Sequence, residues 1–377
     1  MYKRLLDLRS LLKQKSHFLF GARSTGKSTL IRSLNPNDIE LIDLLERDTY
    51  KRLLQKPSIL ETLDQSKIIV IDEIQKIPTL LDEVHRLISK YDTTFLLTGS
   101  SARKLKYGSS NLLAGRAWKS ELFPLSWSEL TDFELERYLT RGGLPQSYKS
   151  EYWQKELAAY VALYLREEIA AEALTRNIES FSEFLDLVAR SNGQEINYQS
   201  FANDCGVTIP TIKNYFSILE DTLLGFSLTA FTKSKKRKAI TRSKHYLFDI
   251  GVVNSLCEVS EVKIKSPYFG NAFEHFIISE VRSANSYLEI NKTLSYWRTT
   301  SQFEVDLILG TDIAIEIKSA NKVQEKHLKG LRALKEENLI NKYVLVSLDK
   351  FESTTNDGIE LLHWESFLKK LWNQTLF

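Results

Sequence analysis

The sequence predicts an α/β protein with three domains, at residues 1–135, 136–245 and 246–377. In the first third, apolar runs of strand length alternate with amphipathic segments, which is typical of a parallel, doubly wound sheet. In the middle, two helical segments flank a glycine turn and precede a run of basic residues. In the last third, two stretches of alternating polar and apolar residues surround a short turn, which favours a second α/β domain.

The composition limits the class of protein. Apolar residues make up 43% of the chain and charged residues 26%, the profile of a globular protein. No apolar run approaches the roughly 18 residues that would cross a membrane, and residues 1–15 lack the features of a signal peptide. Cys205 and Cys257 lie far apart without partners at metal-binding spacing. We therefore expect a cytoplasmic protein with no membrane partner.

A phosphate-binding loop is predicted directly after the first strand. Residues 17–20 are a short strand, and GARSTGKS at 21–28 fits the pattern G-x-x-x-x-G-K-[ST], with a helix at 28–34. Glycines let backbone amides point at phosphate oxygens, Lys27 would neutralise the β and γ phosphates of ATP, and the Ser28 hydroxyl would ligate Mg²⁺. The predicted nucleotide-binding residues are Gly21, Ala22, Arg23, Ser24, Thr25, Gly26, Lys27, Ser28 and Thr29.

Two further strands end in polar residues that suit the same site. The strand at 67–71 ends in Asp72 and Glu73, and we expect Asp72 to hold Mg²⁺ through water and Glu73 to act as general base. An acidic helix cap is the alternative. The strand at 94–97 ends in Thr98, which could sense the γ-phosphate or could belong to an ordinary turn. Strands near 40–43 and a helix at 80–90 complete the predicted sheet.

Three segments beyond this core, in this order, resemble a family of prokaryotic AAA+-like ATPases with a C-terminal domain of uncharacterised function: LAGR at 113–116, LFPLS at 122–126 and RGGLP at 141–145. The resemblance covers nearly the whole chain. It implies a homo-oligomer in which an arginine reaches the γ-phosphate of a neighbouring subunit, with Arg116 the first candidate and Arg103 the second. Pairing with surface carboxylates is the alternative for these arginines. Gln146 departs from the glutamate usual in the family, which argues against an acidic role there.

The middle of the chain has the pattern of a winged helix. A helix at 197–204, a turn at 205–207 and a second helix capped by Thr208 form a helix-turn-helix. A β-hairpin with a cationic tip would follow and could grip phosphates, DNA more readily than RNA. An exposed soluble loop or a protein-contact module is the alternative. The basic residues are Lys233, Lys235, Lys236, Arg237, Lys238, Arg242 and Lys244.

A cluster of charged residues is predicted on two strands of the last third. If Leu309 pairs with Ile313 across the turn at 310–312, Asp306 lies opposite Glu316, and alternation places Lys318 on the face of Glu316. Facing carboxylates destabilise a sheet unless a positive charge lies between them, and a divalent cation such as Mg²⁺ or Mn²⁺ would serve.

Asp306 followed by Glu316-x-Lys318 resembles the PD-(D/E)XK nuclease fold. The resemblance implies a preceding helix, expected at 269–281, whose Glu274 joins Asp306 and Glu316 as a metal ligand, and a catalytic role for Lys318. The alternative is that Lys318 simply neutralises two structural carboxylates.

These patterns together predict an ATP-hydrolysing, Mg²⁺-dependent enzyme that acts on nucleic acid through a winged helix and a metal-dependent, nuclease-like C-terminal domain. In the alternative, the chain is an ATP-dependent regulatory switch or assembly protein. Its nuclease-like domain would then be inactive and would only bind a partner.

Overall fold

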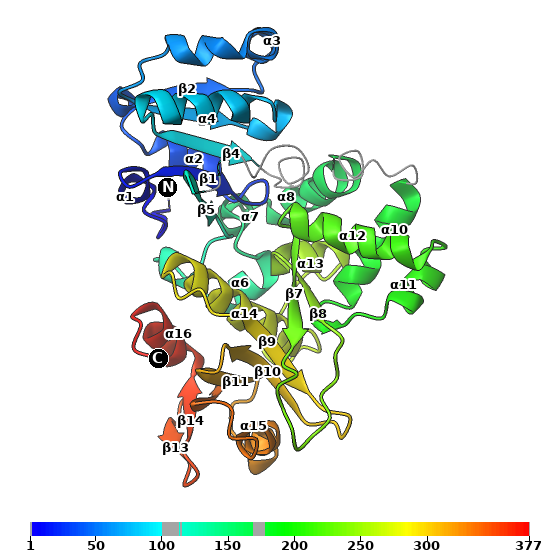
Figure 1. The fold of residues 1–377 in the computed structure, drawn as a ribbon. Helices are drawn as coiled ribbons and strands as arrows, with labels where there is room; N and C mark the ends of the chain where they lie inside the picture. Colours follow the sequence, from blue (N-terminus) through cyan, green and yellow to red (C-terminus); the bar gives the residue numbers. More distant parts are fainter. Residues whose placement is uncertain (1, 100–112, 114, 169–177, 377) are drawn as a thin grey trace. The chain divides into compact units, whose positions relative to one another are not determined.

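A computed structural model describes residues 2–99, 113, 115–168 and 178–376 (Figure 1). The chain divides into two compact units, one formed by Met1–Leu125 with Ser217–Leu224 and the other by Ser126–Phe216 with Gly225–Phe377. The three predicted domains remain predictions, because a compact unit can contain more than one domain.

The first unit is built on a parallel five-stranded sheet, as the sequence predicts. The strand order is β2-β3-β4-β1-β5, and each neighbouring pair is parallel. The strands are β1 (Ser16–Phe20), β2 (Ile39–Asp43), β3 (Ile68–Asp72), β4 (Phe95–Gly99) and β5 (Ala117–Glu121). This is the sheet of a P-loop protein, in which the strand before the phosphate loop lies next to the strand that ends in Thr98.

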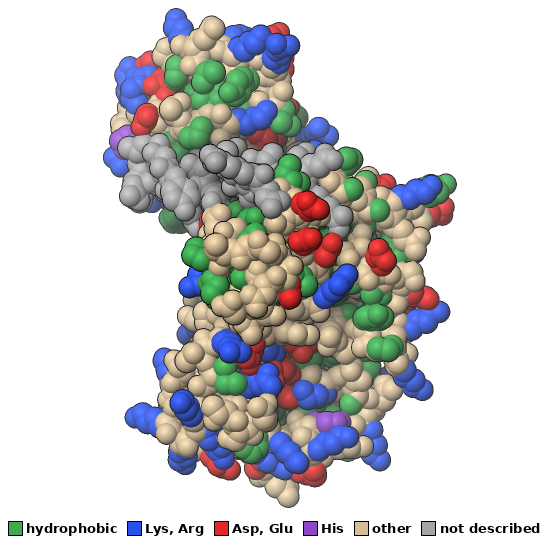
Figure 2. All heavy atoms as spheres, turned by 90° about the vertical axis from the view of Figure 1, so that its right-hand side faces the viewer, with side chains coloured by type: hydrophobic (Ala, Val, Ile, Leu, Met, Phe, Trp, Pro, Cys, Tyr) green, Lys and Arg blue, Asp and Glu red, His purple; other side chains and the backbone are tan. Residues whose placement is uncertain are grey.

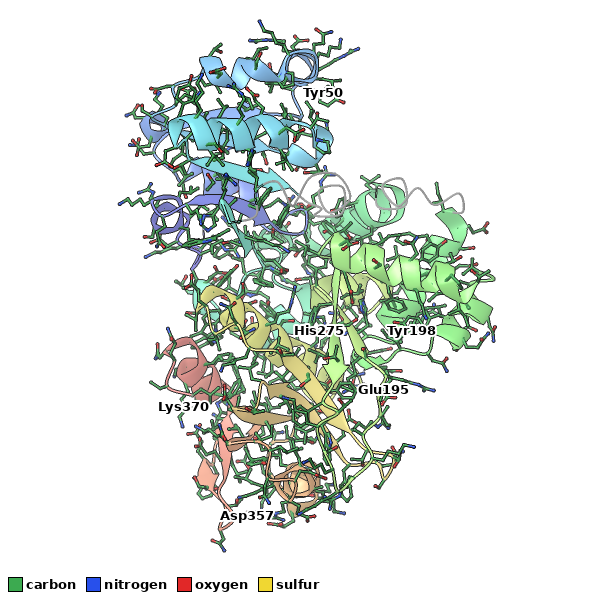
Figure 3. All side chains as sticks on the ribbon, viewed as in Figure 1. Tyr50, Glu195, Tyr198, His275, Asp357 and Lys370 are labelled. Atoms are coloured by element: carbon green, nitrogen blue, oxygen red, sulfur yellow. The ribbon has the colours of Figure 1, made fainter. Side chains whose placement is uncertain are left out.

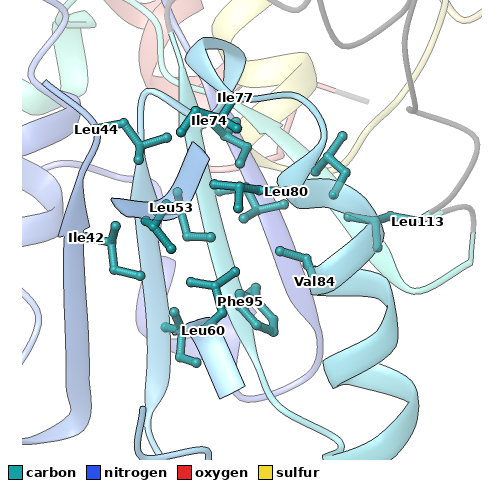
Figure 4. Packing of buried hydrophobic residues seen from close by; sticks show 14 of the residues in the cluster. Ile42, Leu44, Leu53, Leu60, Ile74, Ile77, Leu80, Val84, Phe95 and Leu113 are labelled. Carbon is teal, nitrogen blue, oxygen red and sulfur yellow. The ribbon is translucent and has the colours of Figure 1, made fainter. Parts of the chain in front are cut away.

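Both faces of this sheet are buried. Ile69 and Ile71 belong to one apolar cluster and Val70 to another, because successive side chains of a strand point to opposite faces. Helices α3 (Arg47–Gln55) and α4 (Leu80–Tyr91) contribute to the first cluster, part of which is drawn in Figure 4. Helices α1 (Leu8–Leu12) and α2 (Lys27–Arg32) contribute to the second. Short 3₁₀ helices lie at Pro36–Asp38, Pro57–Thr62 and Ile74–Lys76.

The second unit contains a mixed nine-stranded sheet, in the order β13-β14-β12-β11-β10-β9-β7-β8-β6. Strand β7 pairs antiparallel with β8 and parallel with β9, so the predicted wing strands continue the sheet of the last third. The strands are β6 (Gln194–Glu195), β7 (Gly225–Ala230), β8 (Lys244–Leu247), β9 (Leu294–Arg298), β10 (Glu304–Leu309), β11 (Ile313–Lys318), β12 (Lys342–Ser347), β13 (Ser353–Thr354) and β14 (Ile359–His363).

Helices surround this sheet in Figure 1. They are α6 (Leu135–Arg141), α7 (Pro145–Lys149), α8 (Trp153–Ala159), the π-helix Tyr160–Glu168, α10 (Ile178–Arg190), α11 (Tyr198–Asp204), α12 (Ile209–Asp221), α13 (Ile250–Leu256), α14 (Phe269–Tyr287), α15 (Lys329–Lys335) and α16 (Trp364–Trp372). Short 3₁₀ helices lie at Trp127–Glu129 and Glu325–Leu328. Among the described helices, none is long and apolar enough to cross a membrane.

Helices α11 and α12 form at the positions predicted for the helix-turn-helix. Asn197 caps α11 by accepting a hydrogen bond from the backbone N–H of Ser200. The aromatic side chains here are core residues, since Phe216 packs edge-on against Phe184 with ring centroids 4.9 Å apart and also contacts Phe201. Their burial indicates that these aromatic side chains serve packing.

Candidate functional site

The phosphate loop joins β1 to α2 with backbone angles that need glycine. Gly26 has φ 99° at the start of α2, a conformation that side chains rarely adopt. Gly21 lies so close to the strand on its flank that an added Cβ would be 2.6 Å from the carbonyl oxygen of Leu122. The two glycines of the motif are therefore fixed by the local backbone.

Lys27 is folded over this loop. Its side chain is buried (8% exposed), and Nζ donates to the carbonyl oxygens of Gly21 at 2.7 Å and Ala22 at 3.1 Å. Burial lowers the pKa of Lys27 to about 8, while the negative charges of Glu73 and Asp72 oppose this effect. The ammonium is therefore still mostly protonated at pH 7 and lies near the acidic pair.

The polar residues that end β3 and β4 meet, as the sequence predicts for parallel neighbours. The hydroxyl of Thr98, which is fully buried, donates a hydrogen bond to Oδ1 of Asp72. Glu73 has φ 61°, an uncommon angle for a residue with a side chain, and it accepts a hydrogen bond from the Nε2 amide of Gln75. Sequence reasoning missed Gln75, although its place two residues after Glu73 was the available signal.

Arg4 is a second residue that sequence reasoning missed. Its guanidinium donates to the carbonyl oxygen of Thr25 at 2.6 Å and to that of Phe123 at 2.7 Å. The phosphate loop is thereby tied to the LFPLS segment at 122–126. No pattern in the sequence links residues so far apart.

The chemistry of these side chains fits a magnesium nucleotide. Ser28 is exposed at the start of α2, and Asp72 offers a carboxylate, so a hydroxyl and a carboxylate would hold Mg²⁺, which prefers such hard oxygen ligands. Bound Mg²⁺ would supply charge neutralisation between the β and γ phosphates.

The predicted arginines are placed only in part. Arg116 is exposed, and its backbone N–H donates to the carbonyl oxygen of Leu113 at 2.9 Å. Arg103 lies outside the described residues. Gln146 donates from Nε2 to the Glu156 carboxylate at 2.7 Å.

The RGGLP segment at 141–145 has a structural explanation. Asp249, at the start of α13, is buried and accepts hydrogen bonds from the backbone N–H groups of Gly143 at 2.7 Å and Val252 at 3.1 Å. Gly142 has φ +74°, and a Cβ there would lie 2.1 Å from Oδ1 of Asp249. Burial raises the pKa of Asp249 to about 6, although the backbone N–H groups lower it. The segment therefore fits around one buried carboxylate.

In the last third, the structure brings Asp306, Glu316 and Lys318 together. Leu309 pairs with Ile313 as predicted. Lys318 Nζ lies 2.6 Å from Oε1 of Glu316 and 3.6 Å from Oδ2 of Asp306. That Asp306 oxygen also accepts a hydrogen bond from the backbone N–H of Ile317 at 2.7 Å.

Glu274 on α14 lies beside a residue that the sequence placed in the basic wing. Nζ of Lys244 is 2.6 Å from Oε1 of Glu304 and 3.6 Å from Oε1 of Glu274, and the Tyr246 hydroxyl donates to the same Glu274 oxygen at 2.7 Å. At the end of this chain of contacts, Arg298 pairs with Glu304 at 3.7 Å and with Glu195 at 3.1 Å; Figure 3 labels Glu195.

Burial and mutual repulsion govern the charges here. Burial and then the charge of Asp306 raise the pKa of Glu274 and raise that of Glu316 well above its usual range. Burial lowers the pKa of Lys318, but Asp306 and Glu316 outweigh it, so the pKa is raised. Both lysines near the carboxylates are therefore charged at neutral pH.

The metal site predicted at Glu274, Asp306 and Glu316 does not fit these side chains as they lie. Within the described ranges, no group of three or more His, Cys, Asp or Glu is placed to hold a metal ion. Each of the three carboxylates instead contacts a lysine ammonium. One oxygen, Oε2 of Glu316, is buried and has no hydrogen-bond partner in the described part of the chain.

The basic connection between β7 and β8 is bonded to α15 and to the two residues that follow this helix. The backbone N–H groups of Lys235 and Lys236 donate to Oε2 of Glu337 at 2.8 and 2.9 Å. Arg237 pairs with Glu336 at 2.6 Å. Five of the predicted basic residues are exposed, namely Lys233, Lys235, Lys236, Lys238 and Arg242. Lysine and arginine side chains gather at this lower end of the second unit in Figure 2.

Three models of protein families match successive parts of the chain. Residues 13–131 match a model of an AAA domain, and residues 132–263 and 269–367 match two different domains of unknown function. The chain is therefore similar to an AAA domain over its first third and to two domains of unknown function over the remainder. No nuclease family is among these matches.

Relatives along the length of the chain are themselves uncharacterized. A protein of Methanocaldococcus jannaschii is 26% identical over 93% of this chain and 87% of its own length. A protein of Haemophilus influenzae is 23% identical over 96% of this chain and 98% of its own.

Two solved structures are similar to this chain at a low level. The Aeropyrum pernix ORC1 protein in complex with DNA is 13% identical with a TM-score of 0.29, and the match covers 68% of this chain and 93% of that one. The RuvB Holliday junction branch migration motor of Thermotoga maritima is 16% identical with a TM-score of 0.29, over 59% of this chain and 86% of that one. Similarities this low carry no argument about function.

Proposed function

We propose that the chain hydrolyses ATP with Mg²⁺ at the phosphate loop of its first unit. The observation that carries this proposal is the convergence of Lys27, at the start of α2, with Asp72 and Thr98 on two adjacent strands. Thr98 donates to Asp72, and the charges of Glu73 and Asp72 act on Lys27. Lys27 would exchange the loop carbonyls for phosphate oxygens when ATP binds.

Each residue near the phosphates has a separate role. Ser28 and Asp72 hold Mg²⁺, and Glu73 takes the proton of the attacking water as general base. Thr98, through its hydrogen bond to Asp72, reports whether the γ-phosphate is present. Gln75 holds the Glu73 carboxylate in place. The remaining loop residues contact phosphate through the backbone.

Steady-state ATP hydrolysis by the full chain tests this proposal. Lys27→Ala should abolish turnover, and Glu73→Gln should bind ATP but turn over about 100-fold or more slowly, because only the base is lost. Lys67→Ala is the matched control, since Lys67 lies in the same unit but pairs with Glu40 near the surface. Equal hydrolysis by the wild type and Glu73→Gln would refute the role of Glu73.

Nucleic acid, DNA rather than RNA, is the partner that the second unit fits best. The helix-turn-helix α11–α12 and the exposed lysines at 233, 235 and 238 support it. Contacts within the unit already engage two of the basic side chains. Arg237 donates to the carbonyl oxygen of Ala333 in α15, and the Lys236 ammonium donates to that of Glu336, directly after α15. Changing Lys233, Lys235 and Lys238 to glutamine should weaken binding and flatten its salt dependence, by about 0.9 in log-log slope for each lost phosphate contact. Arg237→Gln, as the control, should leave that slope unchanged.

A homo-oligomer would bring Arg116 to a neighbouring nucleotide. Its exposure is compatible with a contact in trans. Arg116→Ala mixed with Lys27→Ala should regain part of the ATPase activity, because one mixed interface has both an intact arginine and an intact phosphate loop. A monomeric protein with normal turnover would contradict this arrangement.

The second candidate function concerns the C-terminal domain, as a binding module controlled by the nucleotide state of the first unit. The observation that favours it over metal-dependent cleavage is that lysines already contact the carboxylates that a nuclease would use. A panel of DNA and RNA substrates with Mg²⁺ or Mn²⁺ tests it. We expect the wild type and the Asp306→Asn variant to show the same background level of cleavage. Cleavage that depends on Asp306 would restore the nuclease interpretation.

A further inference from the structure

Lys244 is the least expected member of the charged cluster in the second unit. It lies on β8, is only 5% exposed and points its ammonium between Glu304 and Glu274. Lys244 is therefore a buried cation, although its sequence neighbours suggested an exposed phosphate contact.

The cluster has two matching halves. Lys318 lies 2.6 Å from Glu316 and 3.6 Å from Asp306, and Lys244 lies 2.6 Å from Glu304 and 3.6 Å from Glu274. Each ammonium thus bridges two carboxylates. Together the two lysines supply two positive charges, the charge of one divalent metal ion.

We propose that Lys244 and Lys318 are built-in counter-cations that take the place of a metal ion, so that the C-terminal domain folds and binds its partner without metal. Coulomb attraction at these separations is strong in a buried setting and offsets the repulsion between the four carboxylates. Other bonds to the carboxylates strengthen the arrangement, because the Tyr246 hydroxyl donates to Glu274 and the Ile317 N–H donates to Asp306.

Lys244 decides the state of the cluster more than Lys318 does. Lysine is part of the Asp, Glu-x-Lys pattern on β10 and β11, so Lys318 alone is compatible with a metal beside it. Lys244 comes from a different part of the chain and neutralises Glu274, the carboxylate that the metal prediction needs as its third ligand. Without Lys244, the charges of Glu274 and Glu304 would have to be compensated in another way.

This inference rests on the second candidate function, and its test measures metal binding and thermal melting without any cleavage assay. The experiment uses the full chain without nucleotide, in an Asp72→Asn background that removes the carboxylate of the ATP site. Electron paramagnetic resonance measures the concentration of free Mn²⁺ in the presence of this parent protein and of the same protein carrying Asp306→Asn. We expect the two proteins to bind the same amount of Mn²⁺, and Mn²⁺ to leave their melting temperature unchanged.

Lys244→Met keeps the length of the side chain and removes its charge. It should lower the melting temperature by about 6–20 °C, because it leaves the two half-buried carboxylates of Glu274 and Glu304 without their cation, and Mn²⁺ should restore part of the loss. Lys292→Met is the matched control, since Lys292, in the loop before β9, pairs with Asp312 at 3.2 Å at a solvent-exposed position. It should change the melting temperature by about 2 °C or less.

Two results would overturn the proposal. One is that the parent protein binds Mn²⁺ and that Asp306→Asn abolishes this binding, which would show a metal site. The other is a Lys244→Met protein that melts at the parent temperature. If Lys244→Met does not fold, the Mn²⁺ measurement on the parent and Asp306→Asn proteins decides the question by itself. Cleavage without Mn²⁺ binding would contradict the proposed function but leave the counter-cations in place.

Discussion

Glu280 should make the stability of the second unit depend on pH between about 5 and 8. This residue of α14 is buried, and its two carboxyl oxygens accept hydrogen bonds from the backbone N–H of Trp127 and from Nε1 of Trp372, both at 2.8 Å. Burial raises the pKa of Glu280 from 4.5 to about 8; the two hydrogen bonds lower it, and the charge of Glu129 raises it further. Tyr138 is the other titratable group near it.

The sign of the effect follows from the direction of that change. Because the folded protein holds the proton more tightly than the unfolded chain, the stabilisation is complete below pH 4.5 and is lost as the pH rises through 8. At about 1.4 kcal/mol for each pH unit, the full effect on the free energy of unfolding is on the order of 5 kcal/mol. About 3 kcal/mol of this, or 6–12 °C in melting temperature, should be lost between pH 5 and pH 8.

The assay compares thermal melts of the wild type and Glu280→Gln at pH 5, 6.5 and 8. Glutamine cannot titrate, so the wild type should lose about 3 kcal/mol of stability relative to Glu280→Gln between pH 5 and pH 8. Glu261→Gln is the control, because Glu261 is exposed and pairs only with the exposed Lys263 in the described structure. A difference that stays constant from pH 5 to pH 8 would refute the reasoning.

Two further predictions concern the glycine of the RGGLP segment and the general base. Gly142→Ala should destabilise the second unit by about 3 kcal/mol or more, because its Cβ would lie 2.1 Å from Asp249, whereas Gly206→Ala, at φ +63° with open space around it, should cost only about 1–2 kcal/mol. Denaturant unfolding measures both, and equal losses would contradict the proposed clash. Gln75→Leu should lower kcat for ATP about 10-fold or more with little change in KM, because Glu73 loses the amide that holds it. An unchanged kcat, or an effect on KM alone, would show that Gln75 does not position the base.

Local patterns determined the first unit almost completely. A strand of four apolar residues must be buried on both faces, and Ile69, Val70 and Ile71 are each fully buried between two layers of helices. The phosphate loop and Asp72 follow from the same logic, because parallel strands end at one edge of the sheet and present their polar residues there together.

The register of β10 and β11 was also determined locally. The three-residue turn makes Leu309 face Ile313, and alternation then carries Lys318 to Glu316 and Asp306. Residue spacing therefore identified a cluster of charged residues, but it did not identify all of the residues that neutralise the carboxylates.

Only the tertiary structure decided which distant residues complete these sites. Lys244 stands in a basic run, and its neighbours in sequence predict an exposed phosphate contact. It became a buried counter-cation because β8 enters the same sheet as β10. For the same reason, Asp249 accepts a hydrogen bond from the backbone N–H of Gly143, and Arg4 donates one to the carbonyl oxygen of Thr25. Both partners are more than 20 residues away in the sequence. A short motif fixes backbone angles and alternation within a few residues, whereas the partner of a buried charge depends on how the whole chain packs.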